Sequence, residues 1–159
     1  MFKQIAAILG LSSAVVSAAD SFSFGGCKIT APAGWKETTR TNDALTLRSP
    51  NGKEQAMVST MSFSSETTFE DFKKICDKRI AAEKKELSDG FIDPSEPFKS
   101  GNLFGMFFSG GDKKSVRVFS GYLSFTKNQL ITVYVEGAGV SPENHLATFK
   151  KFVSGLKRE

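Results

Sequence analysis

The chain has 159 residues, a formal charge of +4 at pH 7 and 15 phenylalanines. Acidic and basic residues alternate through most of it instead of gathering in one basic stretch, which argues against a nucleic-acid-binding domain. Two cysteines and one histidine are too few to supply the four ligands of a Cys/His zinc site, so that class of metal site is excluded as well.

The N-terminus has the pattern of an export signal. Residues 1–4 form a short, positively charged segment, and residues 5–16 form an apolar run. Small side chains follow at the end of this apolar run. We therefore predict a signal peptide over residues 1–18 and a single mature domain over residues 19–159, in the periplasm or outside the cell. The apolar run is too short to span a bilayer. A lipoprotein would carry a cysteine directly after this run, and Cys27 stands too far along the chain.

The first strand region holds one of the two cysteines. Residues 21–29 alternate weakly between apolar and polar types, and Gly25-Gly26 in the middle offers a β-bulge. A bulge there would bring four apolar side chains to one face: Phe22, Phe24, Cys27 and Ile29. In an oxidising compartment Cys27 could form a disulfide with Cys76. The alternative is two buried free thiols, and the sequence leaves both open.

A turn and a hairpin follow. Ala31–Trp35 is a turn that carries the only tryptophan. Trp35 could be a partner surface, because aromatic residues are common at interface hot spots, or it could close one end of the core. Ala44–Arg48 and Glu54–Phe63 are predicted strands, and the Asn51-Gly52 dipeptide between them is typical of a hairpin.

A helix is predicted after Thr68, which stands three residues before Asp71 as in a capping box. The opposite side of this helix carries charges of mixed sign, as a solvent-facing surface does. The apolar residues behind the cap recur at helical spacing on one stripe: Phe69, Phe72, Ile75, Cys76 and Ile80.

Three strands and a second helix complete the chain. Tight turns separate Leu103–Phe108, Ser115–Phe125 and Leu130–Glu136, which indicates an antiparallel meander. Ser141 then caps a helix with Pro142 at its first position. The buried stripe of this helix is expected to contain Leu146, Phe149, Phe152, Val153 and Leu156. We therefore predict an α+β domain, an α/β/α sandwich in which an antiparallel β-sheet has helices on both faces.

This order of elements resembles the PsbP-like fold, whose family includes the photosystem II extrinsic P subunit, Mog-type nuclear-import factors and DcrB-type exported proteins. The segment Phe24–Trp35 is similar to the family's opening strand and Pro-x-Gly-Trp turn. The helix from Thr68, the glycine-bearing strand Gly101–Phe108, the meander and the helix from Ser141 follow in the family's order. The resemblance covers essentially the whole mature chain. It implies a non-enzymatic binding or assembly role, although this chain lacks the lipidation cysteine of DcrB-type members.

No catalytic pattern stands out in the sequence. His145 is the only histidine, and no Gly-x-Ser-x-Gly elbow presents a nucleophile, so we expect an ordinary surface or rim histidine. Cys76 is expected to be buried and therefore inert. Phe104, Met106 and Phe108 could line a ligand pocket between sheet and helix, but core packing is the default for them. We predict no catalytic residue, no cofactor and no metal.

Three functions remain open. The leading hypothesis is an exported, non-enzymatic binding or accessory module that contacts another extracytoplasmic protein, with a small ligand as a further option and with neither nucleic acid nor a membrane span. The alternative is a periplasmic immunity or inhibitor protein against a secreted toxin, since small size, export and the lack of an active site fit that class too. A remote alternative is a small hydrolase that uses His145.

Overall fold

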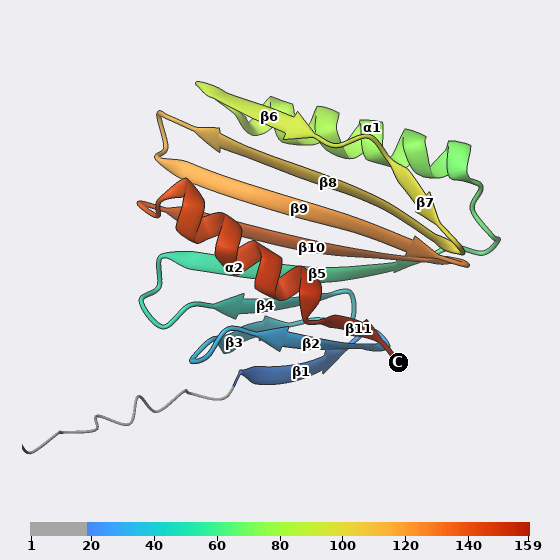
Figure 1. Ribbon diagram of the computed structural model, residues 1–159, viewed down its shortest axis with the longest axis horizontal. Helices are drawn as coiled ribbons and strands as arrows, with labels where there is room; N and C mark the ends of the chain where they lie inside the picture. The colour runs from blue at the N-terminus through green and yellow to red at the C-terminus, as the bar shows by residue number, and fades with distance from the viewer. Residues whose placement is uncertain (1–18) are drawn as a thin grey trace, which may run out of the picture.

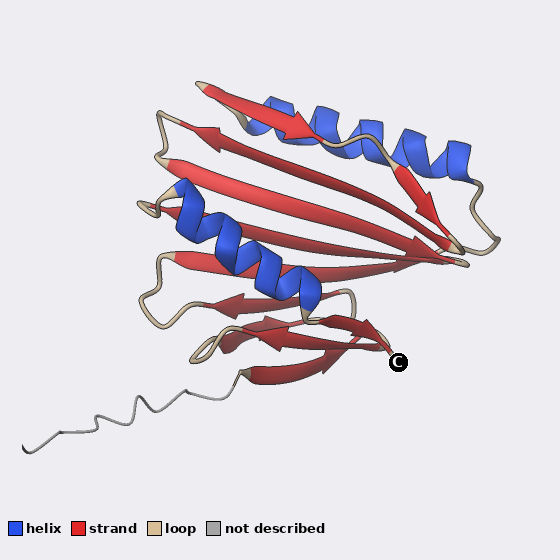
Figure 2. Cartoon of the chain, in the orientation of Figure 1, coloured by secondary structure: helices blue, strands red, loops and turns tan. Residues whose placement is uncertain are grey.

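Two antiparallel sheets and two helices make up residues 19–159, the part of the chain that this computed structural model describes (Figures 1 and 2). The α+β class is therefore confirmed, whereas the predicted signal peptide over residues 1–18 lies outside the described residues. The helices are α1 (Phe69–Glu86) and α2 (Pro142–Ser154). The strands are β1 (Asp20–Phe24), β2 (Cys27–Ala31), β3 (Lys36–Arg40), β4 (Ala44–Arg48), β5 (Glu54–Ser62), β6 (Gly90–Pro94), β7 (Phe98–Ser100), β8 (Leu103–Asp112), β9 (Arg117–Thr126), β10 (Gln129–Ala138) and β11 (Leu156–Arg158).

The first and last strands form a small sheet of their own, in the order β1-β2-β11. Gly25 and Gly26 have φ angles of 59° and 72°, the left-handed values that a two-residue hairpin turn of type I′ requires. Phe24 pairs with Cys27 across this turn, so the predicted bulge was wrong. The four apolar side chains expected on one face nevertheless share it, because directly opposite residues of a hairpin point the same way.

The other strands form a large sheet in the order β3-β4-β5-β10-β9-β8-β6, with β7 paired to β8 as well. The predicted meander is confirmed as β8, β9 and β10, and the predicted hairpin as β4 and β5. In the middle of the sheet β5 pairs with β10, so that Val58 lies opposite Val133. The sequence predicted a single sheet, and the separate small sheet is the main departure from it.

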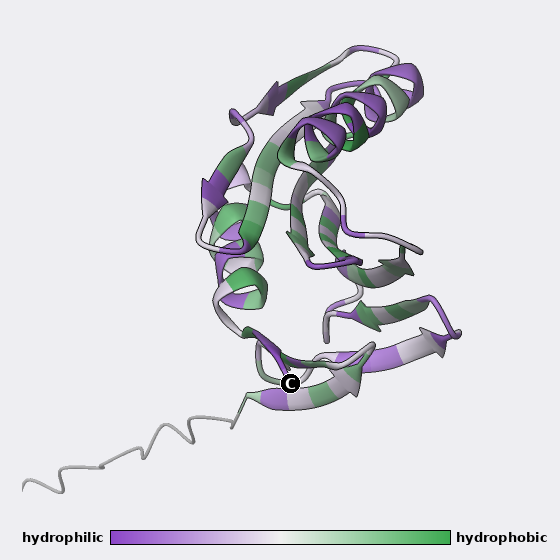
Figure 3. Ribbon diagram, turned by 90° about the vertical axis from the view of Figure 1, so that its right-hand side faces the viewer, coloured by the Kyte–Doolittle hydropathy of each residue, from purple (hydrophilic) through white to green (hydrophobic). Residues whose placement is uncertain are grey.

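Alternate residues of the central strands belong to two separate hydrophobic clusters. On β10, Ile131 and Val133 join a cluster that includes residues of α2, whereas Leu130 and Tyr134 join one that includes residues of α1. This division follows from the strand period, in which neighbouring side chains point to opposite faces. Figure 3 shows the apolar residues spread along the strands of the curved sheet.

Both helices begin at the predicted residues. The Thr68 hydroxyl accepts a hydrogen bond from the Asp71 backbone N–H at 3.1 Å, and the Ser141 hydroxyl accepts one from the Asn144 N–H at 3.2 Å. Pro142 occupies the first turn of α2, where no backbone donor is needed. Within residues 19–159, neither helix is long and apolar enough to cross a membrane.

Candidate functional site

Trp35 is buried, with only 4% of its surface exposed. Its ring packs edge-on against Phe152 of α2, with 4.9 Å between ring centroids. The prediction that Trp35 forms a partner surface is therefore wrong, and the alternative, that it closes one end of the core, is what the structure shows. The ring is buried because the Ala31–Trp35 turn leads directly from the small sheet to the large one, beneath the end of α2.

Cys27 and Cys76 are both free and buried. Cys27 on β2 lies in the cluster that contains residues of α2, whereas Cys76 on α1 lies in the other cluster. The disulfide that the sequence left open is not formed, because these two side chains belong to separate parts of the core. Burial raises the pKa of both thiols, that of Cys76 to about 12, which keeps them protonated and unreactive at neutral pH.

The thiols give a direct test of this arrangement. After purification in air, we expect two unmodified cysteines in the denatured protein and little or no labelling by a maleimide in the native protein, because both side chains are buried. Mass spectrometry of the labelled protein, with and without denaturant, counts the adducts. A denatured sample that accepts no maleimide until a reductant is added would contradict the separation of the two cysteines.

A hollow of the surface lies between α2 and the strands β6 and β8. It is a cleft of about 760 Å³ whose walls are mostly apolar. Strand β8 contributes Phe107, and helix α2 contributes Leu146, Phe149 and Val153. Phe107 stacks on Tyr122 of β9 with 4.5 Å between ring centroids, which holds its ring in the wall of the cleft.

The cleft lies on the face of β8 opposite to the one that the sequence suggested. Phe104 and Met106 point into the cluster with α1, and Phe108 belongs to that cluster although it also borders the cleft. The side chain that forms the apolar wall is Phe107, because a shift of one residue along a strand changes the face. Core packing, the default interpretation of the three predicted residues, therefore holds for their side chains.

Helix α2 is also rotated relative to the prediction. Leu146, which was expected on the buried stripe, is 41% exposed and lines the cleft. His145, which was expected at the surface or rim, is only 3% exposed. The buried stripe therefore runs through His145, Phe149 and Phe152, at positions i, i+4 and i+7 of the helix.

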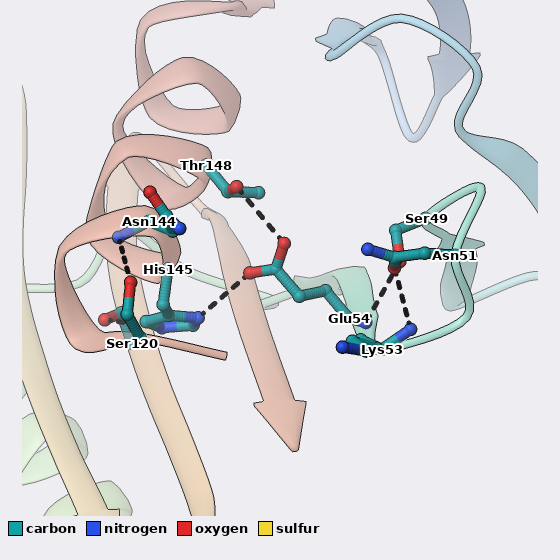
Figure 4. Close-up of polar contacts among 9 residues, drawn as sticks. Ser49, Asn51, Lys53, Glu54, Ser120, Asn144, His145 and Thr148 are labelled. Carbon is teal, nitrogen blue, oxygen red and sulfur yellow. Dashed lines mark hydrogen bonds and ion pairs between the residues drawn. The ribbon is translucent and has the colours of Figure 1, made fainter. Parts of the chain in front are cut away.

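His145 joins two polar side chains from distant strands (Figure 4). Its Nε2 lies 3.1 Å from the Ser120 hydroxyl on β9, and its Nδ1 lies 3.3 Å from Oε1 of Glu54 at the start of β5. One turn further along α2, the Thr148 hydroxyl donates to the other carboxylate oxygen of Glu54 at 3.3 Å. With its proton on Nδ1, the ring donates to Glu54 and accepts from Ser120, so both nitrogens are satisfied.

Burial sets the charge states of this chain of contacts. It lowers the pKa of His145 to about 4, so the ring is neutral at pH 7. It also raises the pKa of Glu54, an effect that the hydrogen bond from Thr148 opposes. Ser120 is the member of this chain of contacts that borders the apolar cleft, although only 1% of its surface is exposed.

No protein-family model matches this chain, and no curated protein matches it. Among solved structures, it is similar to cyanobacterial PsbP (CyanoP) from Synechocystis sp. PCC 6803, at 15% identity and a TM-score of 0.68, over 95% of this chain and 99% of that chain. The chain has the PsbP-like fold. A protein from Bacteroides thetaiotaomicron gives 11% identity and a TM-score of 0.48, over 90% of this chain and 49% of that chain, which is too low to add to the argument.

The PsbP-like fold confirms the family resemblance seen in the order of elements. At 15% identity the likeness concerns the fold alone, and it assigns no function to any side chain. The cleft and the contacts of His145 therefore have to be interpreted from their own geometry.

Proposed function

We propose that the protein is an exported binding or accessory module that contacts another extracytoplasmic protein through the cleft beside α2. The observation that carries this proposal is the cleft itself, a hollow of about 760 Å³ with mainly apolar walls. Exposed apolar hollows of this kind are uncommon on proteins without partners and typically mark a binding site. The PsbP-like fold, for which the sequence resemblance implies binding or assembly roles, supports the same conclusion.

The walls suit a partner that inserts an apolar side chain. Leu146 is 41% exposed at the edge of the cleft, and Phe149 packs edge-on to Phe107 at 6.5 Å inside it. Polar groups surround this apolar centre, as they do at interface hot spots. Asp93 and Lys150 both line the cleft, and within the described residues neither takes part in an ion pair. They are therefore free to fix the orientation of a partner.

The same proposal includes the layer arrangement expected from the sequence, a large sheet with α1 and α2 on opposite faces. The alternation of β10 side chains between the two clusters supports it. In that arrangement α2 covers only part of its face and leaves β8 open beside it. The cleft is then the uncovered part of that face.

A photo-crosslinking amino acid at position 146 tests the proposal in the protein's own cell envelope. We expect one dominant crosslinked partner, because Leu146 stands at the mouth of the cleft. The matched control is the same amino acid at Lys74, an exposed position on α1. Identical crosslinking from both positions, or none from position 146, would count against the cleft as the contact site. A secreted toxin as the partner would make the module an inhibitor.

A further inference from the structure

We propose that Ser120, His145 and Glu54 form a nucleophilic serine site that cleaves carboxylic esters with an apolar acyl group. This activity goes beyond the proposed binding role and needs no protein partner. The sequence predicted no catalytic residue because no motif presents a serine. The fold nevertheless assembles one from β9, α2 and β5, which lie far apart along the chain.

The geometry matches the roles that a serine nucleophile requires. A base must accept the proton of the hydroxyl, and a third group must orient the base. Here His145 Nε2 lies 3.1 Å from the Ser120 hydroxyl, and Nδ1 lies 3.3 Å from the Glu54 carboxylate. Both distances fall within the looser range of a site without substrate. Ser120 and His145 would touch the reacting atoms, and Glu54 would act as a positioning residue.

The same three groups could serve only to tie α2 to the sheet. A purely structural tie, however, does not need to border a hollow, whereas Ser120 borders the cleft; because only 1% of its surface is exposed, a substrate has to enter the cleft fully to reach the hydroxyl. The ring is also neutral at pH 7 and can accept a proton, but with a pKa of about 4 it is a weaker base than an ordinary histidine, which again points to a slow reaction. The contacts therefore place a hydroxyl, a neutral base and an orienting carboxylate at one wall of a space that can hold a substrate.

The cleft sets the class of substrate. Its walls are mostly apolar, formed in part by Phe107 and Phe149, so it suits an aliphatic or aromatic acyl group better than a charged one. Strand β9 is paired on both sides, which commits its backbone to the ladders with β8 and β10. Donors for the developing oxyanion must then come from side chains lining the same cleft, such as Ser109, Ser154 and Lys150.

This absence of free backbone donors on β9 predicts a slow enzyme. Loss of one donor from an oxyanion hole lowers kcat by roughly 100- to 1,000-fold in well-studied hydrolases. Covalent labelling of the serine is therefore a better measurement than substrate turnover, because it detects a single event at each site.

The atoms and protons of this hydrolysis balance with water as the only co-reactant. The Ser120 oxygen bonds to the ester carbonyl carbon while its proton passes to His145 Nε2. When the tetrahedral intermediate collapses, the bond to the alcohol oxygen breaks, and the alcohol leaves with the proton from His145. Water then attacks the acyl-serine and gives a proton to His145, which returns it to the Ser120 oxygen as the carboxylic acid departs.

An alkyl fluorophosphonate is the probe for the nucleophile, because it bonds to activated serines and its chain fits an apolar cleft. We expect one adduct on the full-length protein, which peptide mass spectrometry locates at Ser120. Ser120→Ala should abolish the adduct. Ser95→Ala, which removes a serine of the same cleft that has no role in the proposed chemistry, should retain it. No adduct, or an adduct at another residue, would overturn the proposal.

A second measurement uses the unaltered protein and so does not depend on the folding of a variant. The labelling rate should be constant near pH 7 and fall as the pH is lowered toward about 4, because a protonated His145 cannot accept the serine proton. Circular dichroism at each pH checks that the fold persists. A labelling rate that does not change over this range in folded protein would overturn the role of His145.

The positioning role of Glu54 has its own test. Glu54→Gln keeps the shape of the side chain and removes its charge, so we expect labelling at pH 7 to slow by about tenfold or more. An unchanged rate would overturn this role. The fluorophosphonate probe reacts without a partner protein. A failure to label Ser120 would therefore not change the crosslinking result at position 146, and the two proposals can fail separately.

Discussion

Replacement of Phe72 by alanine is expected to lower the free energy of unfolding by about 3–5 kcal/mol. Phe72 is completely buried on α1, and its ring lies 5.8 Å from Phe104 and 6.3 Å from Phe125, between ring centroids. The other buried residues of this helix are Cys76 and Glu83, while Phe69, Ile75 and Ile80 are partly buried against the same cluster, so Phe72 is the only completely buried aromatic ring that α1 contributes. The loss should therefore be measured easily by urea or guanidinium unfolding.

Phe91→Ala is the matched control, because it makes the same chemical change at a side chain that is 64% exposed on β6. We expect it to change the free energy of unfolding by no more than about 0.5 kcal/mol. Equal losses from the two variants would show that α1 does not depend on Phe72 for its packing. A loss confined to Phe72→Ala, together with reduced helix signal, would support the packing described above.

The second large effect is expected at Gly121 in the middle of β9. A Cβ at this position would overlap the ring of Phe108, which lies directly opposite on β8 and is 2% exposed. Because this ring is packed among other buried side chains, Gly121→Ala should destabilise the protein by about 1–3 kcal/mol. This runs against the general preference for alanine over glycine inside a strand.

The comparison is made with Gly111→Ala on the neighbouring strand. There the nearest atom to a new Cβ is the Arg117 carbonyl oxygen at 3.3 Å, so the crowding is much milder and the loss should be smaller. Adding Phe108→Leu to Gly121→Ala should recover part of the lost stability, since it reduces the obstructing ring. If the second substitution only adds a further loss, overlap with Phe108 is not the cause.

Much of the fold could be predicted because its signals are local. The two helix starts follow from Thr68 and Ser141, whose side chains cap the first turns. The meander follows from apolar runs separated by tight turns. The edge strand β3 could not be predicted in this way, because all five of its residues are exposed and no apolar pattern marks it.

The candidate site was missed because its members meet only through the fold. Glu54 and Ser120 lie on strands that are not neighbours in the sheet, and nothing in the sequence around either residue indicates a contact with His145. One signal could have placed the histidine correctly. It stands four residues before Phe149 and seven before Phe152, the spacing of a buried helical stripe. Assigning Leu146 to that stripe instead moved His145 to the outside.

The small sheet has a consequence for mechanical force. Strands β1 and β11 flank β2 and run in the same direction, because each is antiparallel to it. Tension between Asp20 and Arg158 would thus pull along the strands and load their hydrogen bonds side by side in shear, not one after another as in unzipping. These three strands must slide apart before the load reaches the large sheet. The rate of forced unfolding is governed by the barrier to that first sliding step.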